Sequence, residues 1–393
     1  MTYGGLFLRF LKFGALAFGG PVAQIAMVRR ELVDEERWMS SARFNRLLAV
    51  MQVLPGPEAH ELCVHLGMRA KGRWGGVLAG LGFMLPGFIL MMLLSWLYFH
   101  IDFDRSWVGA AFLGVQAAVI ALIVRAVHRI GEHVLIDYWL WGIGIVAGVA
   151  ALLGVSFWIT LPAAGVAYML AKAGRQGLAL GVAALAAAVA IAVTLITPER
   201  TATAVTVLVA EAPGSVAPLV LFLSGLKAGL LTFGGAYTAI PFLRNDAVGR
   251  GWMGDGQFLD GLALSGILPA PLIIFSTFIG YVAGGPLGAV AITAGIFLPA
   301  FAFSLIFYDR LETLLEAAGV KTLLEGVAAA VVGLIAATTF ELARGLLSQP
   351  DRAPSLIGIA AAALLALYLW KSKFSPPLVL FAAGGVAAFV ISS

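Results

Sequence analysis

One sequence pattern occurs twice in this chain of 393 residues, and it restricts the fold more than any other feature. The first copy reads Leu11-Lys12-Phe13-Gly14, Phe18-Gly19-Gly20-Pro21, Ile25, Arg29, Trp38-Met39, Phe44 and Leu54-Pro55-Gly56-Pro57. The second copy reads Leu226-Lys227-Ala228-Gly229, Phe233-Gly234-Gly235, Ile240, Arg244, Trp252-Met253, Phe258 and Leu268-Pro269-Ala270-Pro271. The matches follow in one order, so the chain contains an internal duplication, an architecture that many secondary transporters share.

The composition is that of a polytopic membrane protein. Hydrophobic residues make up 61% of the chain and charged residues 12%, and the mean hydropathy is +0.98. Apolar runs of about twenty residues recur, each long enough to cross a hydrocarbon core of roughly 30 Å. The net charge of +4 is scattered over loops, which argues against a nucleic-acid partner. With a single cysteine, Cys63, the chain has no intramolecular disulfide, and we expect no metal and no cofactor.

We therefore predict an all-α membrane protein of about thirteen transmembrane helices. The predicted spans are 4–28, 46–67, 74–100, 107–128, 135–153, 155–171 and 177–197, then 217–243, 258–282, 286–308, 322–346, 354–370 and 374–391. Residues 198–215 form the predicted linker between the half at 1–197 and the half at 216–393. An odd number of spans precedes the second copy, so the two halves are predicted to be inverted repeats.

Lysine and arginine residues indicate the orientation. Most lie in loops that this topology places on the side of the N-terminus, which we therefore predict to be cytoplasmic. The exception is the arginine-rich segment 29–46, which the topology places outside. Alternatively, the first two spans are re-entrant hairpins, which would return this segment to the cytoplasmic side without changing the later spans. The sequence leaves both readings open.

Glycine pairs and Pro-x-Pro motifs lie inside apolar spans, where they interrupt a continuous helix. In hydrocarbon the freed backbone groups need partners, so such breaks persist only against protein or a wet cavity. Matching breaks in two halves indicate a transporter's binding site, and helix N-termini at the breaks favour an anion. The predicted substrate-binding residues at the breaks are Phe18, Gly19, Gly20, Pro21, Pro55, Gly56, Pro57, Phe233, Gly234, Gly235, Pro269 and Pro271.

Four basic residues complete the predicted site. Lys12 and Lys227 occupy equivalent positions inside apolar spans, and Arg29 and Arg244 are equivalent at the far end of the same elements. A charged residue within the membrane is costly unless it faces a cavity or a partner, so we include all four as substrate-binding candidates. The alternative is that their long side chains reach a membrane interface.

Glu58, His60, Glu61 and His65 follow the first Pro-Gly-Pro in an otherwise apolar span. A buried carboxylate can carry a proton at physiological pH, so Glu58 is the candidate for proton coupling or gating. Alternatively, Glu58 only stabilises the first turn of the new helix. The two histidines are five residues apart, whereas the zinc-protease motif needs four, so we expect no enzyme and no catalytic residue.

A family resemblance rests on a set of motifs in both copies. They are Phe18-Gly19-Gly20-Pro21, Trp38, Gln52-Val53-Leu54-Pro55-Gly56-Pro57-Glu58-Ala59, Gly67 and Phe83-Met84-Leu85-Pro86-Gly87, and more weakly Phe233-Gly234-Gly235, Trp252 and Leu268-Pro269-Ala270-Pro271. In these residues the chain resembles the chromate ion transporter (CHR) family in its long-chain form with two fused halves. The resemblance implies an exporter in the bacterial inner membrane that confers chromate resistance. The departure is Ala236, which stands where the first copy has Pro21.

We therefore expect a secondary transporter that exports chromate by alternating access between two inverted halves. Chromate is a tetrahedral dianion close to sulfate in size and charge, and the residues do not separate the two. Sulfate or another oxyanion is the alternative substrate, and an anion channel is the alternative mechanism. The expected partners are chromate or sulfate, the lipid bilayer and a second copy of the chain in a homodimer, with no nucleic acid.

Overall fold

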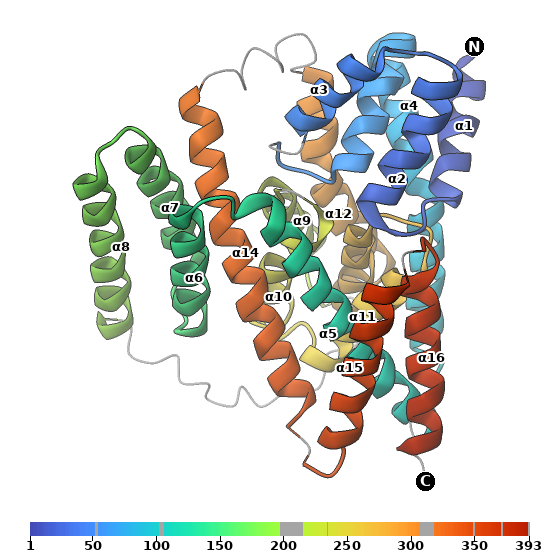
Figure 1. The fold of residues 1–393 in the computed structure, drawn as a ribbon. Coiled ribbons are helices and arrows are strands. Elements are labelled where there is room, and N and C mark those ends of the chain that lie inside the picture. Colours follow the sequence, from blue (N-terminus) through green and yellow to red (C-terminus); the bar gives the residue numbers. More distant parts are fainter. Residues whose placement is uncertain are drawn as a thin grey trace. The chain divides into compact units, whose positions relative to one another are not determined.

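The computed structural model describes residues 1–51, 54–101, 106–196, 215–233, 235–306, 318–348, 350–370 and 372–391. These residues form α-helices and short helical turns, and the single β-bridge among them joins Pro55 and Phe233 (Figure 1). The predicted all-α class is therefore confirmed. Gly234 and most of the predicted linker 198–215 lie outside the described residues.

Every predicted span overlaps at least one of the helical elements of the structure. In the first half these are α1 (Tyr3–Ala15), α2 (Gly20–Arg29), η1 (Arg30–Glu35), α3 (Ser41–Met51), α4 (Glu58–Tyr98), α5 (Ser106–Val134), α6 (Tyr138–Leu152), α7 (Phe157–Lys172) and α8 (Gln176–Ile196). In the second half they are α9 (Pro218–Leu230), η2 (Ala236–Ala239), α10 (Ile240–Ala247), α11 (Asp255–Ile267), η3 (Leu272–Ile274), α12 (Phe275–Ile306), α14 (Ala318–Leu346), α15 (Ala353–Leu369) and α16 (Ser375–Val390).

The helices group into two compact units. Unit 1 comprises Met1–Arg125, Glu211–Leu311 and Leu342–Ser393, and unit 2 comprises Ala126–Ala210 and Glu312–Glu341. Both units contain segments from both halves of the sequence. All four predicted helix breaks lie in unit 1, so the description of the site concerns this unit.

The spans that carry the breaks are helical hairpins rather than straight helices. Arg9 on α1 donates a hydrogen bond to Glu31 at 3.0 Å, although a continuous helix would hold residues so far apart in the sequence about 33 Å from each other. On α9 and α10, Lys227 Nζ lies 2.6 Å from Asp246 Oδ1 in the same way. We name the α1/α2 pair hairpin 1 and the α9/α10 pair hairpin 3.

The Pro-x-Pro breaks also form hairpins. Arg69 Nε, near the end of the first arm of α4, donates at 3.3 Å to the carbonyl of Trp38, which precedes α3, so α3 and this first arm form hairpin 2. A Cβ added at Gly261 of α11 would lie 2.5 Å from Phe278 of α12, which closes hairpin 4. The helices α1 and α9, with 13 residues each, are only about 20 Å long, shorter than a hydrocarbon core of roughly 30 Å, so the hairpins fit the re-entrant alternative.

Each copy then turns sharply into a long second arm. Within α4 the backbone leaves the helix at Lys71 (φ −146°, ψ 27°) and Gly72 (φ 63°, ψ −162°). Within α12 it does so at the equivalent Gly284 (φ −141°, ψ 18°) and Gly285 (φ 63°, ψ −159°). A positive φ at the second turn residue favours glycine, which both copies supply. The duplication in the sequence is thus a duplication in the backbone.

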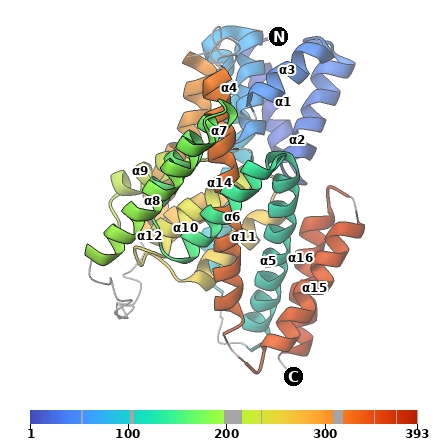
Figure 2. The ribbon, with the colours of Figure 1, turned by 60° about the vertical axis from the view of Figure 1, so that its left-hand side comes forward.

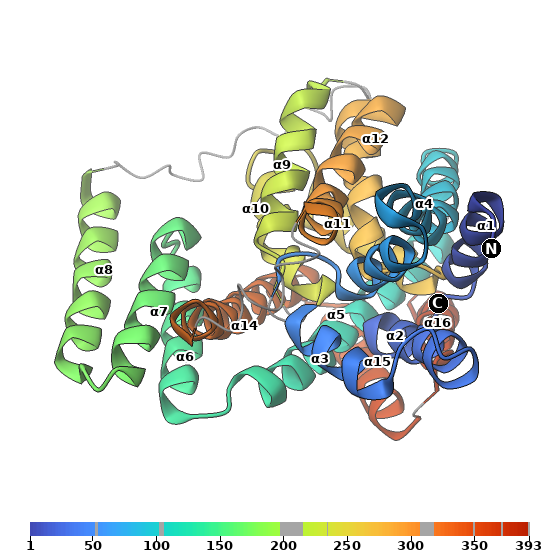
Figure 3. The ribbon, with the colours of Figure 1, turned by 90° about the horizontal axis from the view of Figure 1, so that it is seen from above.

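Glycine contacts repeat between the copies as well. A Cβ added at Gly82 of α4 would lie 2.8 Å from the Phe7 carbonyl of α1, and one at Gly295 of α12 would clash with the equivalent Phe222 carbonyl of α9. Figure 3 shows α9 beside α12 and α1 beside α4. These glycines therefore allow the helix backbones to touch, as expected for glycines that serve close helix packing.

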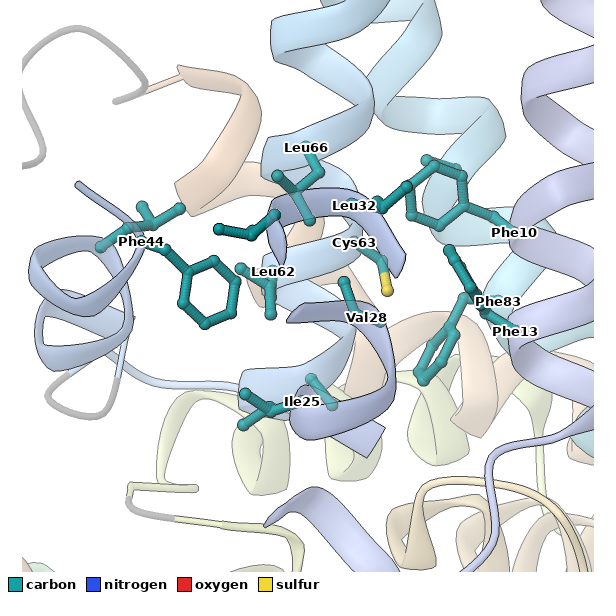
Figure 4. Packing of buried hydrophobic residues seen from close by; sticks show 14 of the residues in the cluster. Phe10, Phe13, Ile25, Val28, Leu32, Phe44, Leu62, Cys63, Leu66 and Phe83 are labelled. Atoms are coloured by element: carbon teal, nitrogen blue, oxygen red, sulfur yellow. The ribbon is translucent and has the colours of Figure 1, made fainter. Parts of the chain in front are cut away.

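Hairpins 1 and 2 share one hydrophobic core with the second arm of α4. Its side chains come from every element of the two hairpins, as Figure 4 shows for Phe10, Phe13, Val28, Phe44 and Phe83. The free Cys63 is buried in this core. Ala17, which directly precedes the first break, is part of this core.

Unit 2 contains α6, α7, α8, the later part of α5 and most of α14 (Figure 2). Asp137 and Ser156 cap α6 and α7 by accepting hydrogen bonds from the Leu140 and Trp158 amides at 3.0 and 3.3 Å. Leu140 and Tyr168 are buried against Ala329 and Val332 of α14. No predicted site residue lies in this unit.

Four helices among the described residues are long and apolar enough to cross a membrane: α4, α5, α12 with η3, and α14. Shorter apolar helices include α6, α7, α9, α15 and α16. Large apolar side chains such as Leu287, Leu365 and Phe389 are exposed, as expected for a surface that faces lipid. Within unit 1, the N-terminus and the C-terminus of the chain lie at opposite ends (Figure 1).

We expect Gly82→Ala and Gly295→Ala each to destabilise the protein by about 1–3 kcal/mol, because the new methyl group would overlap a backbone carbonyl of the neighbouring helix. The control is Gly385→Ala on α16, where no atom lies within 4 Å of the added Cβ. The measurement is the thermal unfolding midpoint in detergent. Equal midpoints for all three variants would contradict the close helix contact.

Candidate anion site at the broken helices

The first break separates α1 from α2. Gly19 and Gly20 have φ values of 89° and 79°, and Pro21 follows in the first turn of α2. Gln24 is buried, and its amide donates to the Ala17 carbonyl at 2.9 Å, which satisfies one backbone group that the break frees. No side chain caps the N-terminus of α2, so its first amide groups remain available for an anion.

The second break separates α3 from α4 and contacts the other copy. Gly56 N–H donates to the Thr232 carbonyl at 2.9 Å, and the neighbouring residues Pro55 and Phe233 form the β-bridge. Thr232 and Phe233 directly follow α9, so they belong to the break of hairpin 3. Two breaks that are far apart in the sequence therefore meet at one place.

A further pair of contacts relates the two copies. A Cβ added at Gly56 would lie 3.2 Å from the Ala300 side chain of α12, and one at Gly87 of α4 would clash with Ala270. Gly56 and Ala270 are equivalent positions of the duplicated pattern, and so are Gly87 and Ala300. Each Pro-x-Pro break thus packs against the second arm of the other copy, as in a two-fold arrangement.

The predicted lysines form ion pairs within their own hairpins. Lys12 Nζ lies 3.5 Å from Glu31, and the Lys12 side chain is 60% exposed. Lys227 Nζ lies 2.6 Å from Asp246, with side-chain exposures of 17% and 2%. Arg250 also lies within 3.2 Å of Asp246. The two pairs are equivalent, and both join the arms of a hairpin rather than standing at the meeting point of the breaks.

The predicted arginines are also held by partners. Arg244 donates to both carboxylate oxygens of Asp255 at 2.8 and 3.2 Å. Arg29 donates to Asn45 at 3.3 Å and lies over the ring of Phe44. Both connect one hairpin to the next within a copy.

Hairpin 1 carries a further ion-pair cluster toward its open end, between Arg9 of α1, Glu31 of η1 and Glu36 directly after η1. Arg9 donates hydrogen bonds to Glu36 and to Glu31. The bond from Arg9 lowers the pKa of Glu36. The carboxylate therefore stays ionised, and the arms of the hairpin stay tied at neutral pH.

A carboxylate different from the predicted one faces the second break. Glu61 is fully buried, and a Cβ added at Gly56 would lie 2.6 Å from its Oε1. Neither oxygen of Glu61 has a hydrogen-bond partner among the described residues. Glu58 is also buried, at the first turn of α4. The pair makes this break acidic in the first copy only.

The neighbouring His60 packs against aromatic rings of the second copy. His60 lies between the rings of Phe297 and Phe301, with centroids 4.9 and 4.7 Å away. No group of three or more His, Cys, Asp or Glu side chains among the described residues could hold a metal ion. His60 instead fills an aromatic contact between α4 and α12.

Asp260 is a functional candidate that the sequence analysis missed. It lies on α11 and is 5% exposed, with hydrogen bonds from Tyr98 and Gln116, both at 2.8 Å. The sequence did contain a clue to Asp260, because an aspartate inside a predicted transmembrane span, here 258–282, indicates a functional site. Its partners come from distant parts of the sequence, so the contact itself was not predictable.

The comparisons with known proteins agree on one family. The sequence profile described as "Chromate transporter" matches residues 4–217 and again 219–389. The chain belongs to the chromate transporter family. Among the relatives of this chromate transporter family member, the "Chromate transport protein" of Pseudomonas aeruginosa is 66% identical over 387 residues, which cover 98% of this chain and 91% of the relative.

Two other relatives of this family member are more distant. The "Chromate transport protein" of Cupriavidus metallidurans is 31% identical, over 98% of this chain and 92% of the relative. The "Probable chromate transport protein" of Synechococcus elongatus is 30% identical, over 94% and 91%. No solved structure matches the chain. The recognition of the family from its motifs is confirmed, and so is the assignment to multi-pass membrane proteins.

We expect Lys227→Ala to destabilise this family member by on the order of 3 kcal/mol, because it removes one partner of the buried Asp246. The matched Lys12→Ala breaks an exposed pair and should cost less than about 1 kcal/mol. Thermal unfolding in detergent measures both. The double variant Lys227→Ala/Asp246→Ala should recover part of the loss, and equal midpoints for the two single variants would contradict the assignment.

Proposed function

We propose that the protein exports chromate across the bacterial inner membrane by alternating access and thereby confers chromate resistance. The observation that carries the proposal is the hydrogen bond from Gly56 N–H to the Thr232 carbonyl, which brings the breaks of both copies together. A site shared by two moving halves can open to either side of the membrane in turn. The resemblance to the family supplies the substrate, and the relatives' names support it.

The packing of the two long arms supports inverted halves. Gly76 of α4 lies against Leu305 of α12, and Gly80 lies against Phe301. The residue number rises along α4 as it falls along α12, so the two equivalent arms run antiparallel. If both cross the bilayer, the copies have opposite orientations, as the odd number of predicted spans requires.

The hairpins support a cytoplasmic N-terminus. The ion pair between Arg9 of α1 and Glu31 of η1 shows that the second arm of hairpin 1 folds back along the first, so the chain returns to the side it entered from. The arginine-rich segment 29–46 then lies on the same side as the N-terminus, as the positive-inside rule favours. This removes the exception that straight spans would create.

The substrate site in this proposal is made mainly of backbone. The uncapped N-termini of α2 and α4 provide amide groups and the positive ends of two helix dipoles. We assign the lining of this site to the residues predicted at the breaks, from Phe18 to Pro21, from Pro55 to Pro57, at Phe233 and Gly235, and at Pro269 and Pro271. Lys12, Lys227, Arg29 and Arg244 contribute by holding the hairpins in place and adding positive charge around them.

Glu58 makes anion binding depend on protons. A dianion at the start of α4 would meet the carboxylates of Glu58 and Glu61, which repel it when ionised. Protonation removes that repulsion, so we propose that Glu58 must be protonated before chromate can enter the site and that it thereby serves as the gate. Chromate affinity then falls as pH rises.

The first experiment measures radiolabelled chromate uptake into inside-out membrane vesicles. We expect Pro55→Ala/Pro57→Ala to lower the initial rate by roughly tenfold or more, equivalent to about 1.4 kcal/mol, because a more continuous helix would replace the break. The control Pro218→Ala/Pro354→Ala changes prolines at helix N-termini, where a break is not needed.

The same vesicles test the alternatives. Competition by sulfate tests the alternative substrate. Counterflow identifies a carrier, whereas current linear in voltage indicates a channel.

A second experiment follows the pH dependence of the half-saturating chromate concentration. In the unmodified protein the half-saturating chromate concentration should rise between pH 6 and pH 8, on the order of tenfold per pH unit at most. Glu58→Gln imitates the protonated side chain and should flatten this dependence. An unchanged pH profile in Glu58→Gln would exclude Glu58 as the gate.

A further inference from the structure

A second buried carboxylate lies apart from the meeting point of the breaks, at Asp260 of α11. Its Oδ2 accepts a hydrogen bond from Tyr98 of α4, and its Oδ1 accepts one from Gln116 of α5, both at 2.8 Å. The Gln116 amide also donates to the Gly256 carbonyl at 3.4 Å. Asp260 therefore joins hairpin 4 of the second copy to two helices of the first half.

The partners of Asp260 are neutral. Among the described residues, no lysine, arginine or histidine nitrogen lies within 4.0 Å of its carboxylate, whereas Asp246 pairs with Lys227 and Asp255 pairs with Arg244. A buried carboxylate without a cation is expensive in its ionised form.

The elements around Asp260 supply no compensating charge either. The bounds of α12, η3 and α16, which pack against α11, contain no Asp, Glu, Lys, Arg or His. Near Tyr98, His100 is engaged with the Trp96 carbonyl at 2.8 Å. On α5 the first charged residue after Gln116 is Arg125, about 13 Å further along the helix. On α11 itself, Asp255 is held by Arg244. Asp260 is thus free to change its charge without breaking an ion pair.

We propose that Asp260 is a proton-binding site that couples proton movement to the rearrangement of the two halves. When the carboxylate is ionised, two charge-assisted hydrogen bonds tie hairpin 4 to α4 and α5. When it takes a proton from water, those bonds weaken and the hairpin is released. The proton returns to water on the other side, and no other reactant is consumed. The inference rests on the carrier function proposed above.

The site belongs to one copy only. The position equivalent to Asp260 in the first copy is Arg46, and the first copy has its buried acids at the break instead. Coupling through Asp260 is therefore distinct from the gating assigned to Glu58. Asp260 should govern net transport driven by a proton gradient, whereas Glu58 should govern chromate affinity.

The test uses the purified full chain in proteoliposomes, with radiolabelled chromate as the probe. Two rates are measured: chromate counterflow without a gradient, and net chromate movement driven by an imposed pH gradient. Counterflow requires the site to change sides with substrate bound but requires no net proton release. We expect Asp260→Asn to keep counterflow within about twofold and to lose at least about 90% of the gradient-driven movement.

The control is Asp137→Asn in unit 2. Asp137 also accepts a hydrogen bond from a tyrosine, Tyr168, at 2.8 Å, but it is paired with Lys172 at 3.0 Å. The Asp137→Asn variant should retain both the counterflow rate and the gradient-driven rate. Gradient-driven movement at the unmodified rate in Asp260→Asn would overturn the proposal. Absence of chromate counterflow in the unmodified protein would instead refute the carrier function.

A second variant separates coupling from structure if Asp260→Asn loses both rates. Tyr98→Phe keeps the carboxylate and removes one donor to its ionised form. We expect coupling to persist, with the pH midpoint of gradient-driven movement raised by roughly 0.5–1 unit. An unshifted midpoint in Tyr98→Phe would show that the cluster is only structural and would overturn the proposal.

Discussion

A backbone hydrogen bond between two interrupted helices is the interaction on which this structure depends. Glycine and proline break the helices of both copies, and a membrane provides no water to satisfy the freed groups. The structure meets this requirement by pairing one copy with the other, through Gly56 N–H and the Thr232 carbonyl. Neither copy can provide this partner alone. The breaks thus make the two copies one structural unit.

Small residues make that pairing possible. The breaks approach the second arms of the opposite copies at Gly56 with Ala300 and at Gly87 with Ala270. A larger side chain at any of these positions would separate the arms and leave the backbone groups of the break without partners. The same positions serve both copies, which is why the contacts come in equivalent pairs.

The two copies share a backbone but differ in chemistry. The first copy has Glu58 and Glu61 behind its Pro-x-Pro break, where the second has Leu272 and Phe275. The second copy buries an ion pair between Lys227 and Asp246, whereas the equivalent pair in the first copy is exposed. A symmetric scaffold can move between two equivalent states, while asymmetric charges make those states respond differently to substrate and protons. This is the basis on which we assign gating to one copy and coupling to the other.

The sequence by itself determined the duplication, the helical class, the positions of the four breaks and the family. These follow from local chemistry, because glycine and proline act on the backbone where they stand and apolar runs of fixed length favour membrane helices. Only the tertiary structure decided that the broken spans fold back as hairpins and that the predicted lysines and arginines hold those hairpins together. It also brought Glu61 to Gly56 and joined Asp260 to Tyr98 across 162 residues of sequence. Such contacts depend on how helical arms pack against one another, and helical periodicity does not encode which distant arm a side chain will meet.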